Sequence, residues 1–190
     1  MASLIDDLQT PGSLPDSPEK ISLVQTHISY VFLTDDFVYK IKKAVNFGFL
    51  DFSTLGKRKY FCDQEVNLNR RLSKDLYIGV VPVIFDGRIH KIGEGSGKVV
   101  EYAVKMKRIP DNILMKSMFE TGRLQEGHLK RIAQVLAGFH LTAQRSAYID
   151  NFGNPDVFKI NTDENFQQTE HYIDITIKRN DFKTIKKLDR

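Results

Sequence analysis

The chain has 190 residues, 41% hydrophobic and 11% aromatic, so it can bury a core as one domain or as one small lobe plus part of another. Its net charge of +4 permits phosphate or nucleic-acid binding, but scattered lysines and arginines favour a solvated surface over a nucleic-acid-binding stripe. The single cysteine, Cys62, excludes an internal disulfide and a cysteine-based zinc site. No apolar run is long enough to span a membrane and no signal-peptide core is present, which predicts a cytoplasmic protein without a membrane partner.

The N-terminal segment, residues 1–20, is rich in helix- and strand-breaking residues: Pro11, Gly12, Pro15 and Pro18. This composition predicts a flexible leader, with one short helix at residues 4–8. Regular structure is expected to begin at Ile21, and residues 21–25 are expected to supply a first strand.

Two strands are predicted next, over residues 26–33 and 37–42, joined by the turn-forming run Thr34-Asp35-Asp36. In the second strand, Val38, Lys40 and Lys42 share one face because side chains alternate. The opposite face carries Phe37, Tyr39 and Ile41, which suit an interior. The first face therefore suits a cleft, with lysines able to reach a ligand.

A helix is predicted after the connection 46–51, with Ser53 as its N-cap. Four residues recur at helical spacing along it: Phe61, Glu65, Leu68 and Leu72. A bare carboxylate on such an apolar face is costly to bury, so Glu65 needs a cationic partner. The preceding strand offers either Lys40 or Lys42.

Three further strands are predicted over residues 80–85, 88–92 and 99–106, the first two joined by the hairpin signal Asp86-Gly87. The glycine-rich run of residues 93–98 is similar to a phosphate-binding P-loop. That motif requires four residues between its glycines and a Ser or Thr after the lysine, and this run has neither. We therefore expect a flexible hairpin loop there.

The rest of the chain has helical character. Residues 127–144 place Leu129, Ile132, Leu136 and Phe139 on one stripe, which predicts His140 as a packed core histidine. A polar stretch at 150–165 leads into predicted helices at 166–173 and from residue 180. The last pattern runs to Arg190 without a C-capping glycine, so we expect a truncated chain.

Four segments, at residues 27–43, 46–55, 68–72 and 77–82, resemble the aminoglycoside phosphotransferase-like family. The resemblance extends over roughly residues 20–190. More narrowly, the chain is similar to the bacterial branch in which such a domain precedes a P-loop ATPase-like domain in a chain of several hundred residues.

The resemblance implies an α+β fold: a protein-kinase-like N-lobe (an antiparallel sheet plus one helix) over residues 21–108, followed by the first helices of a C-lobe over 109–190. It implies ATP and Mg²⁺ as cofactors, with a lysine, Lys40 or Lys42, holding the α- and β-phosphates and Glu65 fixing that lysine. Lys40 is preferred because the apolar residue Val38, which would pack on adenine, lies two positions earlier.

Residues 106–110 resemble the family's hinge, where backbone groups of Met106 and Arg108 would meet the adenine edge. No His-x-Asp catalytic loop occurs before Arg190, so the catalytic aspartate and metal ligands are expected beyond it. The fragment alone is expected to be inactive.

The predicted function is therefore the nucleotide-binding part of an ATP-dependent phosphotransferase acting on a hydroxyl of an unidentified small molecule. Its expected partners are the nucleotide, that acceptor and the C-terminal remainder of the same chain. One alternative is a non-catalytic nucleotide-sensing or docking module attached to an ATPase domain. A basic nucleic-acid-binding domain is the other, and the lack of a glycine-aromatic RNA-binding motif argues against it.

Overall fold

The computed structural model describes residues 3–188. The chain forms two compact units, Met1–Val135 and Leu136–Arg190. The division falls within helix α4 (Glu126–Leu141), whereas the sequence predicts a boundary after residue 108.

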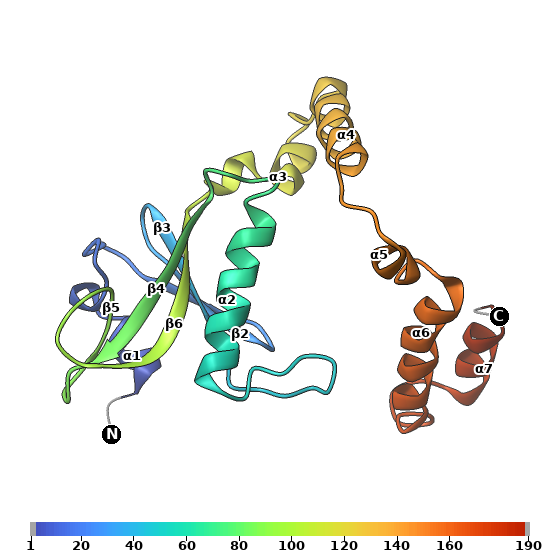
Figure 1. The fold of residues 1–190 in the computed structure, drawn as a ribbon, viewed down its shortest axis with the longest axis horizontal. Helices are drawn as coiled ribbons and strands as arrows, with labels where there is room; N and C mark the ends of the chain where they lie inside the picture. Colours follow the sequence, from blue (N-terminus) through green and yellow to red (C-terminus); the bar gives the residue numbers. More distant parts are fainter. Residues whose placement is uncertain (1–2, 189–190) are drawn as a thin grey trace. The chain divides into compact units, whose positions relative to one another are not determined.

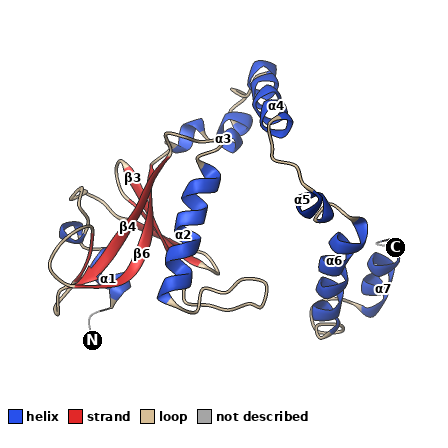
Figure 2. Ribbon diagram, viewed as in Figure 1, coloured by secondary structure: helices blue, strands red, loops and turns tan. Residues whose placement is uncertain are grey.

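The first unit is α+β and is built on one six-stranded antiparallel sheet in the order β1-β2-β3-β6-β4-β5. Its strands are β1 (Ser22–Gln25), β2 (Ser29–Leu33), β3 (Phe37–Lys42), β4 (Tyr77–Phe85), β5 (His90–Ile92) and β6 (Lys98–Lys107). Helix α2 (Leu55–Asn69) lies along β4 and β6, as Figures 1 and 2 show. An antiparallel sheet with one helix after the third strand agrees with the predicted order of elements.

The two faces of the sheet carry different side chains, and the register assigns them. Directly opposed residues of antiparallel strands share a face. Phe32 pairs with Tyr39, and Ile41 with Ala103, and all four are buried in the main core. Val38, Lys40 and Lys42 lie on the other face, as predicted, and this is the face that α2 partly covers.

The N-terminal segment is packed, which differs from the expected flexible leader. Helix α1 (Leu4–Leu8) occurs as predicted and is followed by a 3₁₀ turn, η1 (Pro11–Ser13). Leu8 and Leu14 are buried in the main core. Asp16 accepts hydrogen bonds from the hydroxyl groups of Tyr39 (2.7 Å) and Thr34 (2.9 Å). These contacts give the proline-rich segment an ordered place against the sheet.

Helix α2 begins one residue later than predicted and buries a different stripe. Thr54, not Ser53, is the N-cap, and its hydroxyl accepts from the amide of Lys57. The buried residues are Arg58, Cys62 and Val66, whereas Leu68 and Leu72, expected on the apolar face, are exposed. The prediction was wrong here because apolar spacing alone did not show that an arginine contributes to the buried side.

The glycine-rich loop between β5 and β6 is tighter than the predicted flexible hairpin. A Cβ on Gly95 would lie 2.7 Å from Cδ1 of Ile84, and one on Gly97 would lie 2.7 Å from the carbonyl oxygen of Phe85. Gly97 therefore excludes larger residues, because its neighbour is backbone, whereas at Gly95 the neighbour is the end of a side chain that can move.

After β6 come η2 (Asp111–Ile113), α3 (Met115–Glu120) and α4, followed in the second unit by α5 (Ala147–Asn151), α6 (Pro155–Glu170) and α7 (Arg179–Leu188). The expected polar lead at 150–165 is largely helical, because Asn154 caps α6 and Pro155 occupies its first turn. His140 is exposed, so the prediction of a packed core histidine was wrong. Within residues 3–188, no helix is both long and apolar enough to cross a membrane.

Candidate functional site

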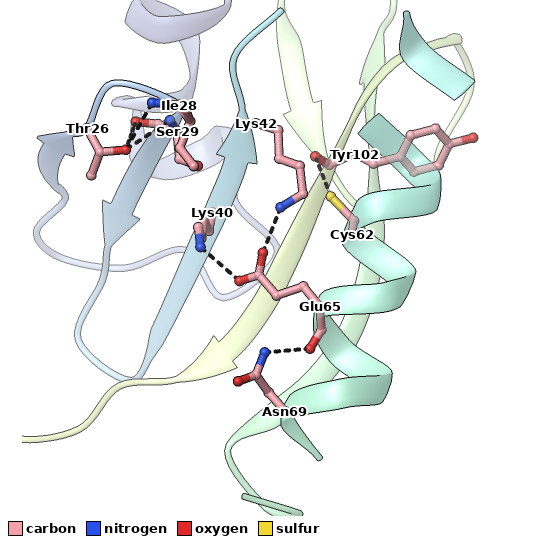
Figure 3. Close-up of polar contacts among 9 residues, drawn as sticks. All are labelled: Thr26, Ile28, Ser29, Lys40, Lys42, Cys62, Glu65, Asn69 and Tyr102. Atoms are coloured by element: carbon pink, nitrogen blue, oxygen red, sulfur yellow. Dashed lines mark hydrogen bonds and ion pairs between the residues drawn. The ribbon is translucent and has the colours of Figure 1, made fainter. Parts of the chain in front are cut away.

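Two lysines of β3 converge on one carboxylate of α2 (Figure 3). Lys40 Nζ lies 2.9 Å from Oε1 of Glu65, and Lys42 Nζ lies 2.7 Å from Oε2. The pairing predicted from the sequence is confirmed, and both candidate lysines take part. The side chains of Lys42 and Glu65 are 6% and 14% exposed, while that of Lys40 is 29% exposed. Lys40 is thus the more accessible of the two cations.

The ionisation of Glu65 follows from these contacts. Burial opposes the charged form, but hydrogen bonds from Lys42 and Lys40 outweigh it and hold the pKa of the carboxyl below its ordinary value. Two ammonium groups facing one carboxylate leave an excess positive charge. The cluster can therefore receive an anionic ligand on its open, Lys40 side.

The remaining surroundings of the cluster are mostly apolar. The ammonium of Lys42 lies 5.0 Å from the centre of the buried Phe52 ring. Cys62 and Val66 of α2 pack with Val104 of β6. Burial raises the pKa of the Cys62 thiol to about 11, so this group is neutral and no nucleophile near pH 7.

The first residue of β2, Ser29, lies on the same face of the sheet. Ser29 is directly opposite Lys42 in the register, so the two side chains share a face. Its hydroxyl is buried and has no hydrogen-bond partner among the described residues. An unsatisfied donor therefore lies on the face that carries the lysines.

An apolar pocket of about 290 Å³ opens at the end of β6. Val38 and Met106, both predicted site residues, line it and are directly opposite each other in the sheet. The other lining residues come from the ends of β2 and β6, from the residue before β4 and from the segment after β6: Leu33, Leu76, Lys107, Arg108, Ile109, Asp111 and Leu114. Val38 is also two residues from Lys40, so the strand joins the apolar pocket to the cationic cluster.

Arg108 lines this pocket, but its polar groups are engaged elsewhere. Its amide donates to the carbonyl oxygen of Asp36 (2.8 Å), and its guanidinium donates to that of Thr34 (2.6 Å). In this conformation its amide is not open to a ligand, which differs from the expected role. The amide of Ile109 has no hydrogen-bond acceptor within the part of the chain that the structure describes.

A second buried ion pair, Arg58–Glu101, was missed by the sequence analysis. Arg58 Nε lies 2.7 Å from Oε2 of Glu101, and both side chains are 10% exposed. The available signal was the position of Arg58, seven residues before Glu65 and so on the same side of a helix. Among residues 3–188, no cluster of three or more His, Cys, Asp or Glu could hold a metal ion.

Comparison with known proteins gives relatives without an established activity. Uncharacterized proteins of Mycobacterium tuberculosis (strains CDC 1551/Oshkosh and H37Rv) and Mycobacterium bovis are each 34% identical to the chain over 154 residues. That match covers 81% of the chain but 29% of each relative, so the chain corresponds to less than a third of their length. No family profile and no solved structure matches the chain.

Proposed function

We propose that the first unit binds ATP as the nucleotide-binding part of a phosphotransferase with a protein-kinase-like N-lobe. The observation that carries the proposal is the Lys40–Glu65–Lys42 cluster, which lies on the same sheet face as the Val38–Met106 pocket. A strand lysine fixed by a helix glutamate is the arrangement that orients nucleotide phosphates in kinase-like proteins.

In this proposal the two lysines have different tasks. Lys40, the more exposed, contacts the α- and β-phosphate oxygens as a point charge. Lys42, almost fully buried, keeps Glu65 ionised and in place when Lys40 turns toward the ligand. Chemistry of this type depends on positioning and charge neutralisation, and both would come from the cluster.

The apolar pocket would receive the adenine ring. Val38 and Met106 would pack together on one face of the ring, and the unpartnered amide of Ile109, rather than that of Arg108, would donate to its edge. The volume of about 290 Å³ is near the lower end of the range of about 300–1,000 Å³ that is typical of ligand pockets. It suits one flat heterocycle better than a whole nucleotide.

When bound with ATP, Mg²⁺ would supply charge neutralisation at the phosphates in this proposal. The described residues offer no metal cluster, so we expect its ligands, the catalytic aspartate and the acceptor site in further residues of a longer chain. The acceptor is a hydroxyl-bearing small molecule. Without the catalytic residues, the 190-residue chain is expected to bind ATP but to transfer no phosphoryl group.

Calorimetric titration of the purified chain with ATP and with adenosine tests this function. We expect saturable binding of ATP that is weakened at least tenfold by Lys40→Met, because a phosphate contact is lost, while adenosine binding changes little. Lys43→Met is the matched control, since Lys43 directly follows β3 but faces the Tyr30 ring. Absence of ATP binding, or equal losses in the Lys40 and Lys43 variants, would contradict the proposal.

A further inference from the structure

The Arg58–Glu101 pair connects three segments around the N-terminal end of α2. Besides its bond to Glu101, the Arg58 guanidinium donates through Nη1 to the carbonyl oxygens of Phe52 (2.9 Å) and Ser53 (3.3 Å). Oε1 of Glu101 accepts from the amide of Tyr102 (3.1 Å). The pair therefore joins α2 to β6 and to the connection that leads from β3.

Strand β6 is irregular at the point where Glu101 meets α2. Val83 of β4 pairs with Glu101, but the next residue, Ile84, pairs with Val99, so β6 holds one extra residue, Val100. With strict alternation Glu101 would share the core face of Ala103. Instead Val100 packs against the core and Glu101 contacts Arg58. Bulges of this kind re-aim a side chain.

The pair lies on the same side of α2 as the site. Arg58 and Glu65 are seven residues apart, which places them within about 20° of each other around the helix axis and about 10 Å apart along it. The helix thus contacts the sheet through two buried ion pairs of opposite polarity. Arg58 meets an anion of β6, and Glu65 meets the cations of β3.

Few apolar side chains of α2 fix the rotation of this helix. Its buried apolar residues among those described, Cys62 and Val66, are small, and the half-buried Phe61 adds a ring contact to Phe52 (5.1 Å between centroids). Since side-chain tips lie about 5–6 Å from a helix axis, a rotation of about 20° moves them by about 2 Å. Such a shift would take the Glu65 carboxylate, now 2.7 Å from Lys42, out of hydrogen-bonding range.

We infer that Arg58 and Glu101 are positioning residues that fix the rotation of α2 and thereby hold the Glu65 carboxylate between Lys40 and Lys42. The pair costs desolvation, since burial raises the pKa of the Glu101 carboxyl even though Arg58 favours its charged form. Replacement of a buried ion pair by apolar residues is often neutral or stabilising, so stability alone does not account for one at this position. In relation to ATP, the inference rests on the proposed function.

The test uses Glu101→Met, which leaves Arg58 without its acceptor, and reads the pKa of Glu65 by carbon NMR of its carboxyl group. Removal of a negative charge would by itself lower the pKa of Glu65. Loss of positioning separates Glu65 from its lysines and raises that pKa. The direction of the shift therefore distinguishes the two effects. We expect the pKa of Glu65 to rise and ATP binding to become at least tenfold weaker.

The double variant Arg58→Met/Glu101→Met keeps the test decisive where the single variant folds poorly. We expect it to recover thermal stability, because no buried charge is left unpaired, while the pKa of Glu65 stays raised and ATP binding stays weak. Asp63→Asn is the matched control: it breaks an exposed ion pair with Lys59 on the same helix and should leave both readouts unchanged.

The outcomes separate the positioning role from the proposed function. A Glu65 pKa that stays low in both Glu101 variants would overturn the positioning role, whatever happens to stability. If the wild-type chain does not bind ATP but Glu101→Met still raises the pKa of Glu65, the positioning role is supported and the proposed nucleotide function is contradicted.

Discussion

Ion pairs of nearly equal length occur in both units of the chain, yet they differ in what they can do. In the first unit, the Lys42–Glu65 and Arg58–Glu101 pairs are 2.7 Å long and buried. In the second unit, the Lys159–Asp163 pair (2.6 Å) and the Arg179–Asp174 pair (2.8 Å) are half exposed or more. Exposed pairs are screened by water and contribute little, whereas a buried pair fixes geometry and is costly to break. Burial, not distance, therefore distinguishes these two pairs of the first unit from those of the second.

The largest difference should appear when one carboxylate is removed from each unit. Glu65→Leu leaves two lysines facing each other, one of them buried, and should lower the free energy of unfolding of the first unit by about 3–5 kcal/mol. Asp163→Asn, the matched change in the second unit, should cost no more than about 0.5 kcal/mol. Urea unfolding, with hydrogen exchange to assign each transition to a unit, measures both. Equal costs would remove the distinction between the two regions.

Hydrogen exchange should separate the units in the wild-type chain. Phe182 is the buried hydrophobic residue of the second unit among those described, and Ile160, Tyr172 and Ile185 are exposed. With little buried apolar area, its helices should open easily. We expect amides of residues 145–188 to exchange at least about 100-fold faster than those of β2 and β3, unless the exposed apolar residues drive self-association. A monodisperse monomer with equal protection in both regions would contradict this.

Acid titration should distinguish the two buried carboxyls of the first unit. The pKa of Glu65 lies below its ordinary value of 4.5 and that of Glu101 lies above it. Glu65 therefore contributes stability that is present above pH 4.5 and is lost as the pH falls through its folded pKa. The contribution of Glu101 falls as the pH rises from 4.5 through its raised folded pKa. NMR titration should place the two midpoints on opposite sides of 4.5, and Glu65→Gln should flatten the acid limb of the stability curve. A Glu65 midpoint above 4.5 would show that the lysines do not outweigh burial there, and a Glu101 midpoint below 4.5 would show that burial does not dominate at Glu101.

The smallest effect concerns the cap of α2. Thr54→Ala removes the hydroxyl that accepts from the Lys57 amide and should cost about 1 kcal/mol. Ser53→Ala should cost less, because the Ser53 hydroxyl bonds Asp51 rather than a helix amide. Thermal unfolding of the two variants compares them, and a larger loss for Ser53→Ala would restore the cap predicted from the sequence.

The sequence was sufficient to predict where the strands lie and that Glu65 pairs with lysines of β3. Alternation placed Lys40 and Lys42 on one face of β3, and the cost of burying Glu65 identified its partners before any geometry was known. The Asp86-Gly87 hairpin was predicted correctly for the same kind of local reason. The strands and the hairpin depend on residues close together in the chain. The site pairing depends on one large free-energy term, the cost of burying an unpaired carboxylate.

Features that depend on distant contacts were missed. The bulge that turns Glu101 toward Arg58 arises from a register between β4 and β6, which no local pattern encodes. The leader packs because Leu8 and Leu14 fill the sheet core, although its prolines and glycine suggest a loose segment. The apolar stripe of α4 was predicted to bury His140, but only tertiary contacts can decide whether such a stripe is covered, and in this structure it is exposed.

The central claim is that the β3 lysines, Glu65 and the Val38–Met106 pocket form one nucleotide site. NMR titration of the isotope-labelled chain with ATP tests it most directly. We predict saturable shifts of the Val38, Lys40, Met106 and Ile109 amides, with the amides of α6 and α7 unchanged. Absence of shifts at these positions at millimolar ATP, or shifts confined to the second unit, would contradict the account.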